Sequence, residues 1–201
     1  MFLNSLKHRL ALFSAAAILI TVFILMMIFN GILQQKQNQV LSALSTKATA
    51  VASGLYSHAI SKMEENIIFT TRDPVLMEAI LDKNPDVIDK RIFPTGNRLE
   101  ATGVATNLRL LSLDNKLLYT RNDQESGDYN LQLATDSVSQ MKILSGVESV
   151  DGAEPEIHLV FPLTRHGQPI AVVDMALSLS AVMSKFKAIS NSDWAIYGVN
   201  N

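Results

Sequence analysis

The hydrophobic pattern of this chain begins with one long apolar stretch, Leu10 to Phe29, which carries no charged residue. Its polar members are Ser14 and Thr21. Twenty residues at about 1.5 Å rise give roughly 30 Å of helix, the thickness of a bilayer's hydrocarbon core. A helix that is apolar on all sides is unusual for a soluble domain of this size. The stretch therefore predicts a transmembrane helix over residues 10–30.

A second pattern follows directly and predicts one long helix over residues 31–72. Apolar or small residues recur there mostly three and four positions apart, at Leu33, Val40, Leu44, Ala48, Val51, Leu55, Ala59, Met63 and Ile67. Such a seam serves either a dimeric coiled coil or packing against the chain's own domain. We expect the stalk to end near Asp73-Pro74, because proline disfavours helix at the residue before it.

Short helices are predicted next. Asp73-Pro74 and Asn84-Pro85 each combine an N-cap residue with proline in the first turn. They predict helices over 75–81 and 86–92, followed by a turn at 93–96 and a further helical turn within 98–105.

From residue 107 the pattern changes to strands joined mostly by hairpins. Strands are predicted over 108–112, 117–121, 146–150, 156–164, 168–179 and 194–199, with helices over 133–144 and 180–189. The predicted fold class is therefore α+β, with a PAS-like central antiparallel sheet of about five strands flanked by short helices.

Charge near the apolar stretch indicates its orientation. Lys7, His8 and Arg9 precede the stretch, whereas the segment Gln34 to Gln39 after it contains a single charged residue, Lys36. The positive side stays cytoplasmic. We expect a cytoplasmic tail (1–9), a single pass through the inner membrane (10–30), and a stalk (31–72) and sensor domain (73–201) in the periplasm. The competing interpretation is a cleaved signal peptide, but no small-x-small cleavage site follows the stretch.

Composition narrows the function classes. The 201 residues include 17 basic and 19 acidic residues without a basic stripe, which argues against nucleic acid as a partner. There is no cysteine, and the four histidines lack metal-ligand spacing. No nucleophile elbow, P-loop or dinucleotide fingerprint occurs. We expect no catalytic site, metal or cofactor in this segment.

Several residues support a family resemblance. They are the strand ending Tyr119-Thr120-Arg121 with Gly127-Asp128 beyond it, Gly146-Val147-Glu148, Pro162, the run Gly167 to Asp174, and Asp193 to Tyr197. With the anchor and stalk, they resemble the Cache family of extracytoplasmic sensor domains, which have a PAS-like sheet behind a long N-terminal helix. The similarity is greatest to double-Cache-like modules of chemotaxis transducers, sensor kinases and cyclases. Ala171 and Asp174 depart from the glycine and glutamate that are common in the family.

The resemblance also bears on what surrounds this segment. Such receptors return through a second membrane helix to a cytoplasmic output domain. We therefore expect the sequence to be the front part of a longer receptor, with an enzymatic output domain possible beyond residue 201.

Asp174 is the first candidate site residue, because it lies in the middle of an apolar strand. Alternation places it on one face with Val172 and Ala176. A carboxylate on a covered face needs a partner. The partner is either a ligand ammonium group or an internal donor such as Arg109 or Arg121, and internal pairing is favoured.

Four more residues are candidates for the pocket. Arg121, with Tyr119 on the same face, suits an anionic ligand group, although a solvated strand end is equally compatible. By the family's pattern this strand and the following loop, which includes Asp128, border the pocket. His158 either lines the pocket or is a hydrogen-bonded core histidine, and the second interpretation is favoured.

Together these features predict the ligand-sensing domain of a membrane-anchored signalling receptor. An amino acid, carboxylate or amine would bind in the pocket and shift the long N-terminal helix. We expect a homodimer along the stalk. The alternative is a membrane-tethered protein-interaction module without a small-molecule ligand, recognisable by an exposed apolar patch and a filled sheet cavity.

Overall fold

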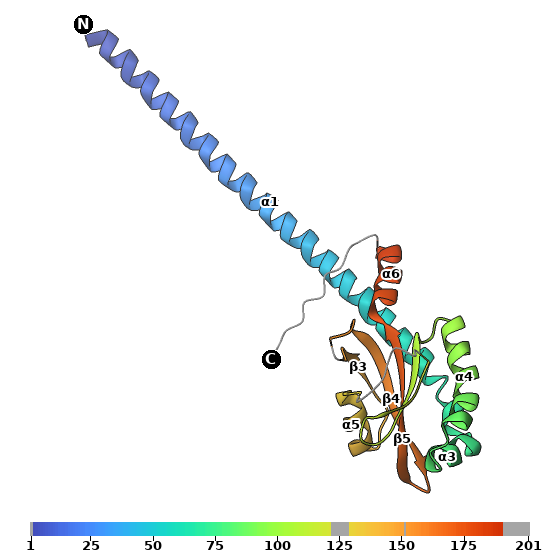
Figure 1. Ribbon diagram of the computed structural model, residues 1–201. Helices are drawn as coiled ribbons and strands as arrows, with labels where there is room; N and C mark the ends of the chain where they lie inside the picture. The colour runs from blue at the N-terminus through green and yellow to red at the C-terminus, as the bar shows by residue number, and fades with distance from the viewer. Residues whose placement is uncertain (1, 122–128, 151, 191–201) are drawn as a thin grey trace. The chain divides into compact units, whose positions relative to one another are not determined.

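The computed structural model describes residues 2–121, 129–150 and 152–190, and within these it does not place the side chains of residues 2–18, 68, 69 and 190. The chain divides into two compact units, Met1–Ala50 and Val51–Asn201. Helix α1, Phe2–Glu64, contributes to both units (Figure 1). The predicted division into segments 1–9, 10–30, 31–72 and 73–201 stays a prediction.

The first unit consists of the N-terminal part of α1. The part Leu19–Glu64 contains a stretch long and apolar enough to cross a membrane, and none of that stretch is buried. This agrees in length and composition with the spanning segment expected from the sequence.

In the second unit, α1 ends at Glu64, earlier than the predicted end near residue 72. Asn66 explains the break, because its side-chain amide donates to the carbonyl of Lys62 at 2.8 Å and its backbone N–H bonds the carbonyl of Met63 at 2.9 Å. Asparagine competes in this way with helical hydrogen bonding. A single further turn, α2, Ile68–Thr71, completes the segment.

The two proline-capped helices form, and each begins one residue before its predicted start. In α3, Pro74–Leu81, the Asp73 side chain accepts from the N–H groups of Val75 and Leu76. In α4, Pro85–Ala101, the Asn84 side chain accepts from the N–H of Val87.

The predicted turn at residues 93–96 is wrong, because α4 continues through Pro94 to Ala101. Pro94 and Lys90 are both exposed, so the carbonyl of Lys90 that lacks its usual N–H donor faces water. Ile88, Ile92 and Leu99 are buried on the opposite side of the helix. This packing holds α4 together across the proline.

The sheet has five antiparallel strands in the order β2-β1-β5-β4-β3, which confirms the predicted α+β class. The strands are β1 Asn107–Leu111, β2 Leu117–Thr120, β3 Leu144–Glu148, β4 Glu156–Arg165 and β5 Gln168–Ser178. Helix α6, Leu179–Ser190, follows β5 directly. The predicted strand 194–199 lies outside the described residues.

Helix α5, Gln132–Gln140, ends four residues before the predicted boundary at Leu144, which instead begins β3. Met141 adopts a left-handed conformation with φ of 52°. The N–H of Lys142 then bonds the carbonyl of Ser137 at 3.1 Å, and the N–H of Met141 bonds that of Val138 at 3.3 Å. This pair of bonds closes a helix C-terminus.

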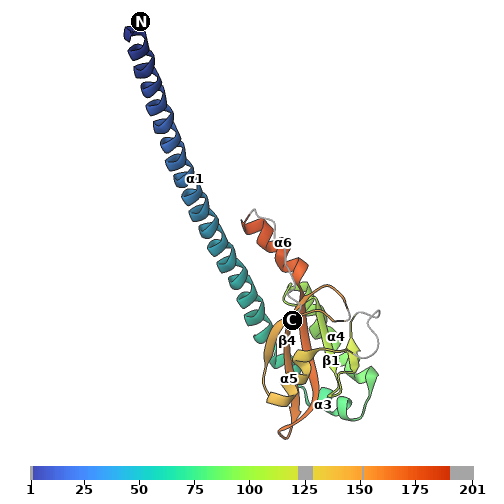
Figure 2. The ribbon, with the colours of Figure 1, turned by 90° about the vertical axis from the view of Figure 1, so that its left-hand side faces the viewer.

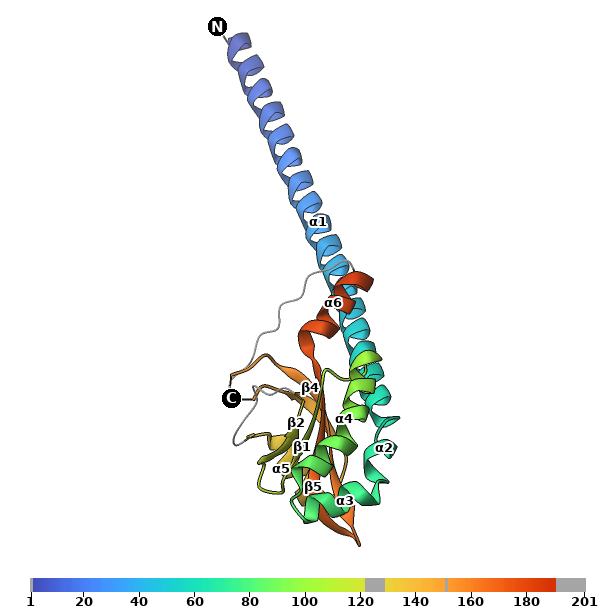
Figure 3. The same ribbon diagram turned by 45° about the vertical axis from the view of Figure 1, so that its right-hand side comes forward.

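The two faces of the sheet carry different cores, as strand alternation requires. Helices α3 and α4 and the C-terminal end of α1 cover one face, where Met63, Leu110 and Val173 belong to the larger core (Figures 1 and 3). Helix α5 covers the other face, where Leu111, Val160 and Val172 belong to the smaller core (Figure 2). The candidate site lies on the α5 face.

Candidate functional site

Three charged or ionisable side chains meet on the α5 face of the sheet, one from each of three neighbouring strands. Arg109 of β1 lies opposite Asp174 of β5, and His158 of β4 lies opposite Ala176, two residues from Asp174. Asp174 and His158 are completely buried, and Arg109 is only 3% exposed. Burial of this kind is rare for charged residues unless they are paired.

Asp174 is the centre of the cluster. Its Oδ2 pairs with Nη1 of Arg109 at 3.2 Å, and its Oδ1 accepts from Nδ1 of His158 at 2.9 Å. The internal partner considered from the sequence, Arg109, is thus the one found in the structure. Excellent pairing of this kind offsets the large desolvation cost of a buried carboxylate.

A second carboxylate extends the cluster toward the start of β4. Nη2 of Arg109 pairs with Oε2 of Glu156 at 2.9 Å, and Nδ2 of Asn107 donates to Oε1 of Glu156 at 2.9 Å. Glu156 is 16% exposed at its side chain, so this end of the cluster reaches the solvent boundary. We refer to Arg109, Glu156, His158 and Asp174 as the charged cluster.

The segment before α5 covers the charged cluster with an aromatic ring. The guanidinium of Arg109 lies 4.9 Å from the centroid of the buried Tyr129 ring, a cation–π contact. Glu148 of β3 holds α5 in place, because its carboxylate accepts from the N–H groups of Gln132 and Leu133 at 3.1 Å each. A carboxylate at a helix N-terminus also complements the helix dipole.

His158 has a distinctive bonding pattern. Nδ1 donates to Asp174, whereas Nε2 is buried and has no hydrogen-bond partner among the residues that the structure describes. Burial acts to lower the pKa of His158, but the hydrogen bond to Asp174 and the charges of Asp174 and Glu156 outweigh it, so that the pKa is raised. When the ring is protonated, it also presents an N–H at Nε2, which is costly to leave unsatisfied. This atom is suited to an acceptor group of a ligand.

The other predicted site residues do not join this cluster. Tyr119 pairs with Leu110 and belongs to the larger core on the opposite face of the sheet. Its buried hydroxyl has no hydrogen-bond partner within the described part of the chain, and burial, with the charge of Asp89, raises the pKa of Tyr119.

Arg121 follows β2 and forms an ion pair with Glu100 of α4, on the same side as Tyr119. Asp128 lies outside the described residues. The structure thus brings His158 and Asp174 together and separates Tyr119 and Arg121 from them. Which of the predicted residues bind a ligand stays a prediction.

Three residues of the site were not predicted as site residues from the sequence. Arg109, flanked by Leu108 and Leu110, carries the same signal as Asp174, a charge in the middle of an apolar strand, but we used it only as a possible partner. Glu156 lies at a strand start and Tyr129 in a polar stretch, where the sequence gives no signal of burial.

No protein-family model and no curated protein matches the sequence. Solved structures do match its fold. The domain of a sensory box/GGDEF family protein from Vibrio parahaemolyticus is 9% identical, with a TM-score of 0.56 over 75% of this chain and 64% of that chain. The E. coli DcuS sensor domain is 13% identical, with a TM-score of 0.52 over 69% of this chain and 98% of that chain.

The ligand-binding domain of Mlp24, solved with asparagine, is 10% identical, with a TM-score of 0.50 over 73% of this chain and 62% of that chain. The chain thus spans less than two thirds of the GGDEF-family and Mlp24 structures and almost all of the DcuS domain. These similarities show that the chain shares the fold of solved sensor and ligand-binding domains, in agreement with the fold that the family resemblance predicted.

Proposed function

We propose that this chain is the ligand-sensing part of a membrane-anchored receptor and that its ligand binds over the charged cluster on the α5 face of the sheet. The observation that carries this proposal is the buried Nε2 of His158, which has no partner among the described residues while the rest of the cluster is paired. The fold shared with sensor domains supports it.

Charge balance favours an amino acid as the ligand, among the amino acids, carboxylates and amines expected from the sequence. With His158 protonated, the charged cluster holds two cations, Arg109 and His158, and two anions, Glu156 and Asp174. A zwitterion adds no net charge to this buried region, whereas a simple anion or amine does. The asparagine in the Mlp24 structure is a ligand of this kind.

Signal transmission would use the helices attached to the sheet. A ligand acts through its affinity difference between two packings of the domain, and small helix shifts are a common response. The proposal includes an N-terminus in the cytoplasm, a domain in the periplasm, a homodimer along the stalk, and an output domain elsewhere in a longer receptor.

The test is a thermal-shift screen of the full chain in lipid nanodiscs against amino acids, carboxylates and amines. The informative variant is His158→Asn, because the asparagine amide can still donate to Asp174 but has no group at the position of Nε2. The matched control is His166→Asn in the exposed β4–β5 turn, where φ is 52° and asparagine is well tolerated.

A compound that stabilises the wild type and His166→Asn but not His158→Asn supports the proposal. If no compound stabilises the wild type, or if every hit persists in His158→Asn, the proposed site is wrong.

One observation favours the alternative, a protein-interaction module. β3 is an edge strand, and the exposed residues Met141, Ile143 and Val147 lie in it or just before it. An exposed edge can pair with a strand of a partner. This alternative predicts an empty ligand screen and self-association or partner binding that Ile143→Lys abolishes.

A further inference from the structure

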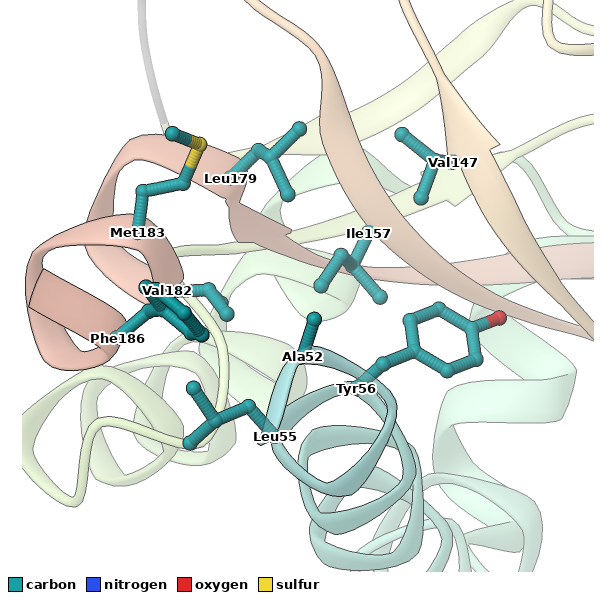
Figure 4. A pocket seen from close by; sticks show the side chains of 9 residues that line it. All are labelled: Ala52, Leu55, Tyr56, Val147, Ile157, Leu179, Val182, Met183 and Phe186. Atoms are coloured by element: carbon teal, nitrogen blue, oxygen red, sulfur yellow. The ribbon is translucent and has the colours of Figure 1, made fainter. Parts of the chain in front are cut away.

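A cavity lies on the opposite face of the sheet from the charged cluster. It is lined by the C-terminal part of α1, by α6, and by strands β3 and β4, and it is partly open to the surface (Figure 4). Its volume is about 160 Å³. Ile157 forms part of its wall and belongs to the larger core, whereas Asp174 faces the smaller core across the sheet. The cavity is therefore independent of the site in the proposed function.

The chemistry of the wall is uniform. The described side chains that line the cavity are apolar, apart from the hydroxyl of Tyr56. That hydroxyl donates to Oγ of Ser145 at 3.3 Å and points away from Val182 and Phe186 in Figure 4. A water molecule needs two to four polar partners to be held in a cavity. Since the wall does not supply them, it favours an apolar occupant.

The wall is also held in place. Ile157 lies in the hydrogen-bonded β4 strand and is 1% exposed, and Phe186 of α6 is 2% exposed. A dry apolar cavity of about 150 Å³ is large enough to bind benzene. The space here is of that size and accepts a single ring.

We propose that this cavity binds a small, neutral, apolar molecule of the size of benzene or toluene. A charged ligand is excluded because the wall offers no counter-charge to offset its desolvation. The occupant would contact α1 through Ala52, α6 through Val182, and the sheet through Ile157. It would thereby stabilise the packing of α6 against the C-terminal part of α1.

The experiment uses the full chain in lipid nanodiscs with ¹³C-labelled methyl groups of methionine and isoleucine. Toluene is the probe, and benzoate, the same ring with a charge, is the comparator. The NMR shifts of the Met183 and Ile157 methyl groups are followed during titration. Ala52→Leu fills the cavity from α1, and Ala50→Leu is its matched control, because Ala50 is exposed on the same helix and does not line the cavity.

We expect saturable toluene shifts in the wild type and in Ala50→Leu, no response to benzoate, and affinity at least about tenfold weaker in Ala52→Leu. Val147→Phe provides a second filling variant at an exposed strand position that tolerates an aromatic side chain. It should weaken toluene binding in the same direction even if Ala52→Leu fails to fold.

Four results would overturn the proposal. They are the absence of saturation in the wild type, an equal response in the filling variants, an equal response to benzoate, and a shift of the same methyl groups with protein concentration alone. The last would show that a second copy of the chain occupies the cavity. None of them bears on ligand binding over the charged cluster.

Discussion

Asp174 is the residue on which the charged cluster depends, because both Arg109 and His158 bond its carboxylate in a fully buried position. Removing one partner of a buried ion pair costs about 3–5 kcal/mol, since the remaining charge stays desolvated. We expect Asp174→Asn to lower the free energy of unfolding by about 3 kcal/mol. This value is at the low end of the range, because Arg109 remains paired with Glu156 in the variant.

Hydrogen exchange of the β5 amides would measure this loss. The control is Asp82→Asn at an exposed position, where a change within about 0.5 kcal/mol is expected. Equal effects at the two positions would show that the pairing of Asp174 contributes nothing to stability.

The raised pKa of His158 makes a prediction for pH. A pKa raised above its usual value near 6.5 means that the folded state binds the proton more tightly than the unfolded state. The resulting stabilisation is complete below about pH 6.5 and is lost as pH rises through the higher folded pKa. As pH rises through the folded pKa, the unfolding temperature of the wild type should therefore fall more than that of His158→Asn. Parallel curves for the two proteins would contradict the prediction.

The sequence predicts the buried carboxylate but not which residues join it. A charge inside an apolar strand implies an internal partner, and this reasoning holds for both Asp174 and Arg109. The register between β1 and β2 decides on which face of the sheet Tyr119 lies. In the structure, Arg109 of β1 is paired with Thr120 of β2 on one side and with Asp174 of β5 on the other. A shift of one residue in the pairing of β2 with β1 would have placed Tyr119 opposite Arg109, on the face of the charged cluster. Local sequence does not determine that register.

At the scale of elements, helix starts were predicted better than helix ends. Asp73 and Asn84 are local signals that act within three residues, and both cap the expected helices. The course of α4 beyond Pro94 is decided by burial of Ile88, Ile92 and Leu99, which is tertiary information. The same applies to α5, which ends where its chain enters β3.

Pro94 should therefore be a costly residue in α4. It removes a helical hydrogen bond, and proline in a helix interior costs up to about 3 kcal/mol relative to alanine. Proline also lowers the conformational entropy of the unfolded chain, which offsets part of this cost. We expect Pro94→Ala to raise the free energy of unfolding by about 1–2 kcal/mol, measured by chemical denaturation. Pro85→Ala is the control. Pro85 lies in the first turn, where a backbone N–H has no partner within the helix, so its replacement should not stabilise the protein.

Asp73 combines two roles in α3 that substitutions can separate. Its carboxylate caps the helix and pairs with Arg91 of α4, with Nε–Oδ2 at 2.8 Å and Nη2–Oδ1 at 3.0 Å, and the bond to Arg91 lowers the pKa of Asp73. Asp73→Asn keeps a capping oxygen and loses the ion pair, whereas Asp73→Ala loses both.

In chemical denaturation at neutral pH, we expect the alanine variant to be less stable than the asparagine variant by about 1 kcal/mol, the contribution of a cap. The ion pair with Arg91 should make the wild type more stable than Asp73→Asn at neutral pH. Because the pKa of Asp73 is lowered in the fold, this difference in stability should disappear as pH falls through the lowered pKa. Equal stability of the two variants would exclude a capping role.

For the whole molecule, the sequence predicts the order of parts because each has its own hydrophobic period. An uninterrupted apolar run, spacing of three and four, and alternation distinguish the anchor, the stalk and the sheet. The pairing order β2-β1-β5-β4-β3 places β5 in the centre and thereby buries Asp174. Pairing order is a long-range property that these periods do not encode.

The orientation in the membrane is the prediction that applies to the chain as a whole. Since the sequence contains no cysteine, Ser5→Cys and Ser45→Cys each introduce a unique thiol on either side of the apolar stretch. Lys7 and Arg9 should hold the N-terminal side in the cytoplasm. A membrane-impermeant maleimide should label Ser45→Cys in intact spheroplasts and Ser5→Cys only after permeabilisation. Labelling in the opposite order would place the charged cluster in the cytoplasm, and loss of the Ser5 thiol from the mature protein would show a cleaved signal peptide instead of an anchor.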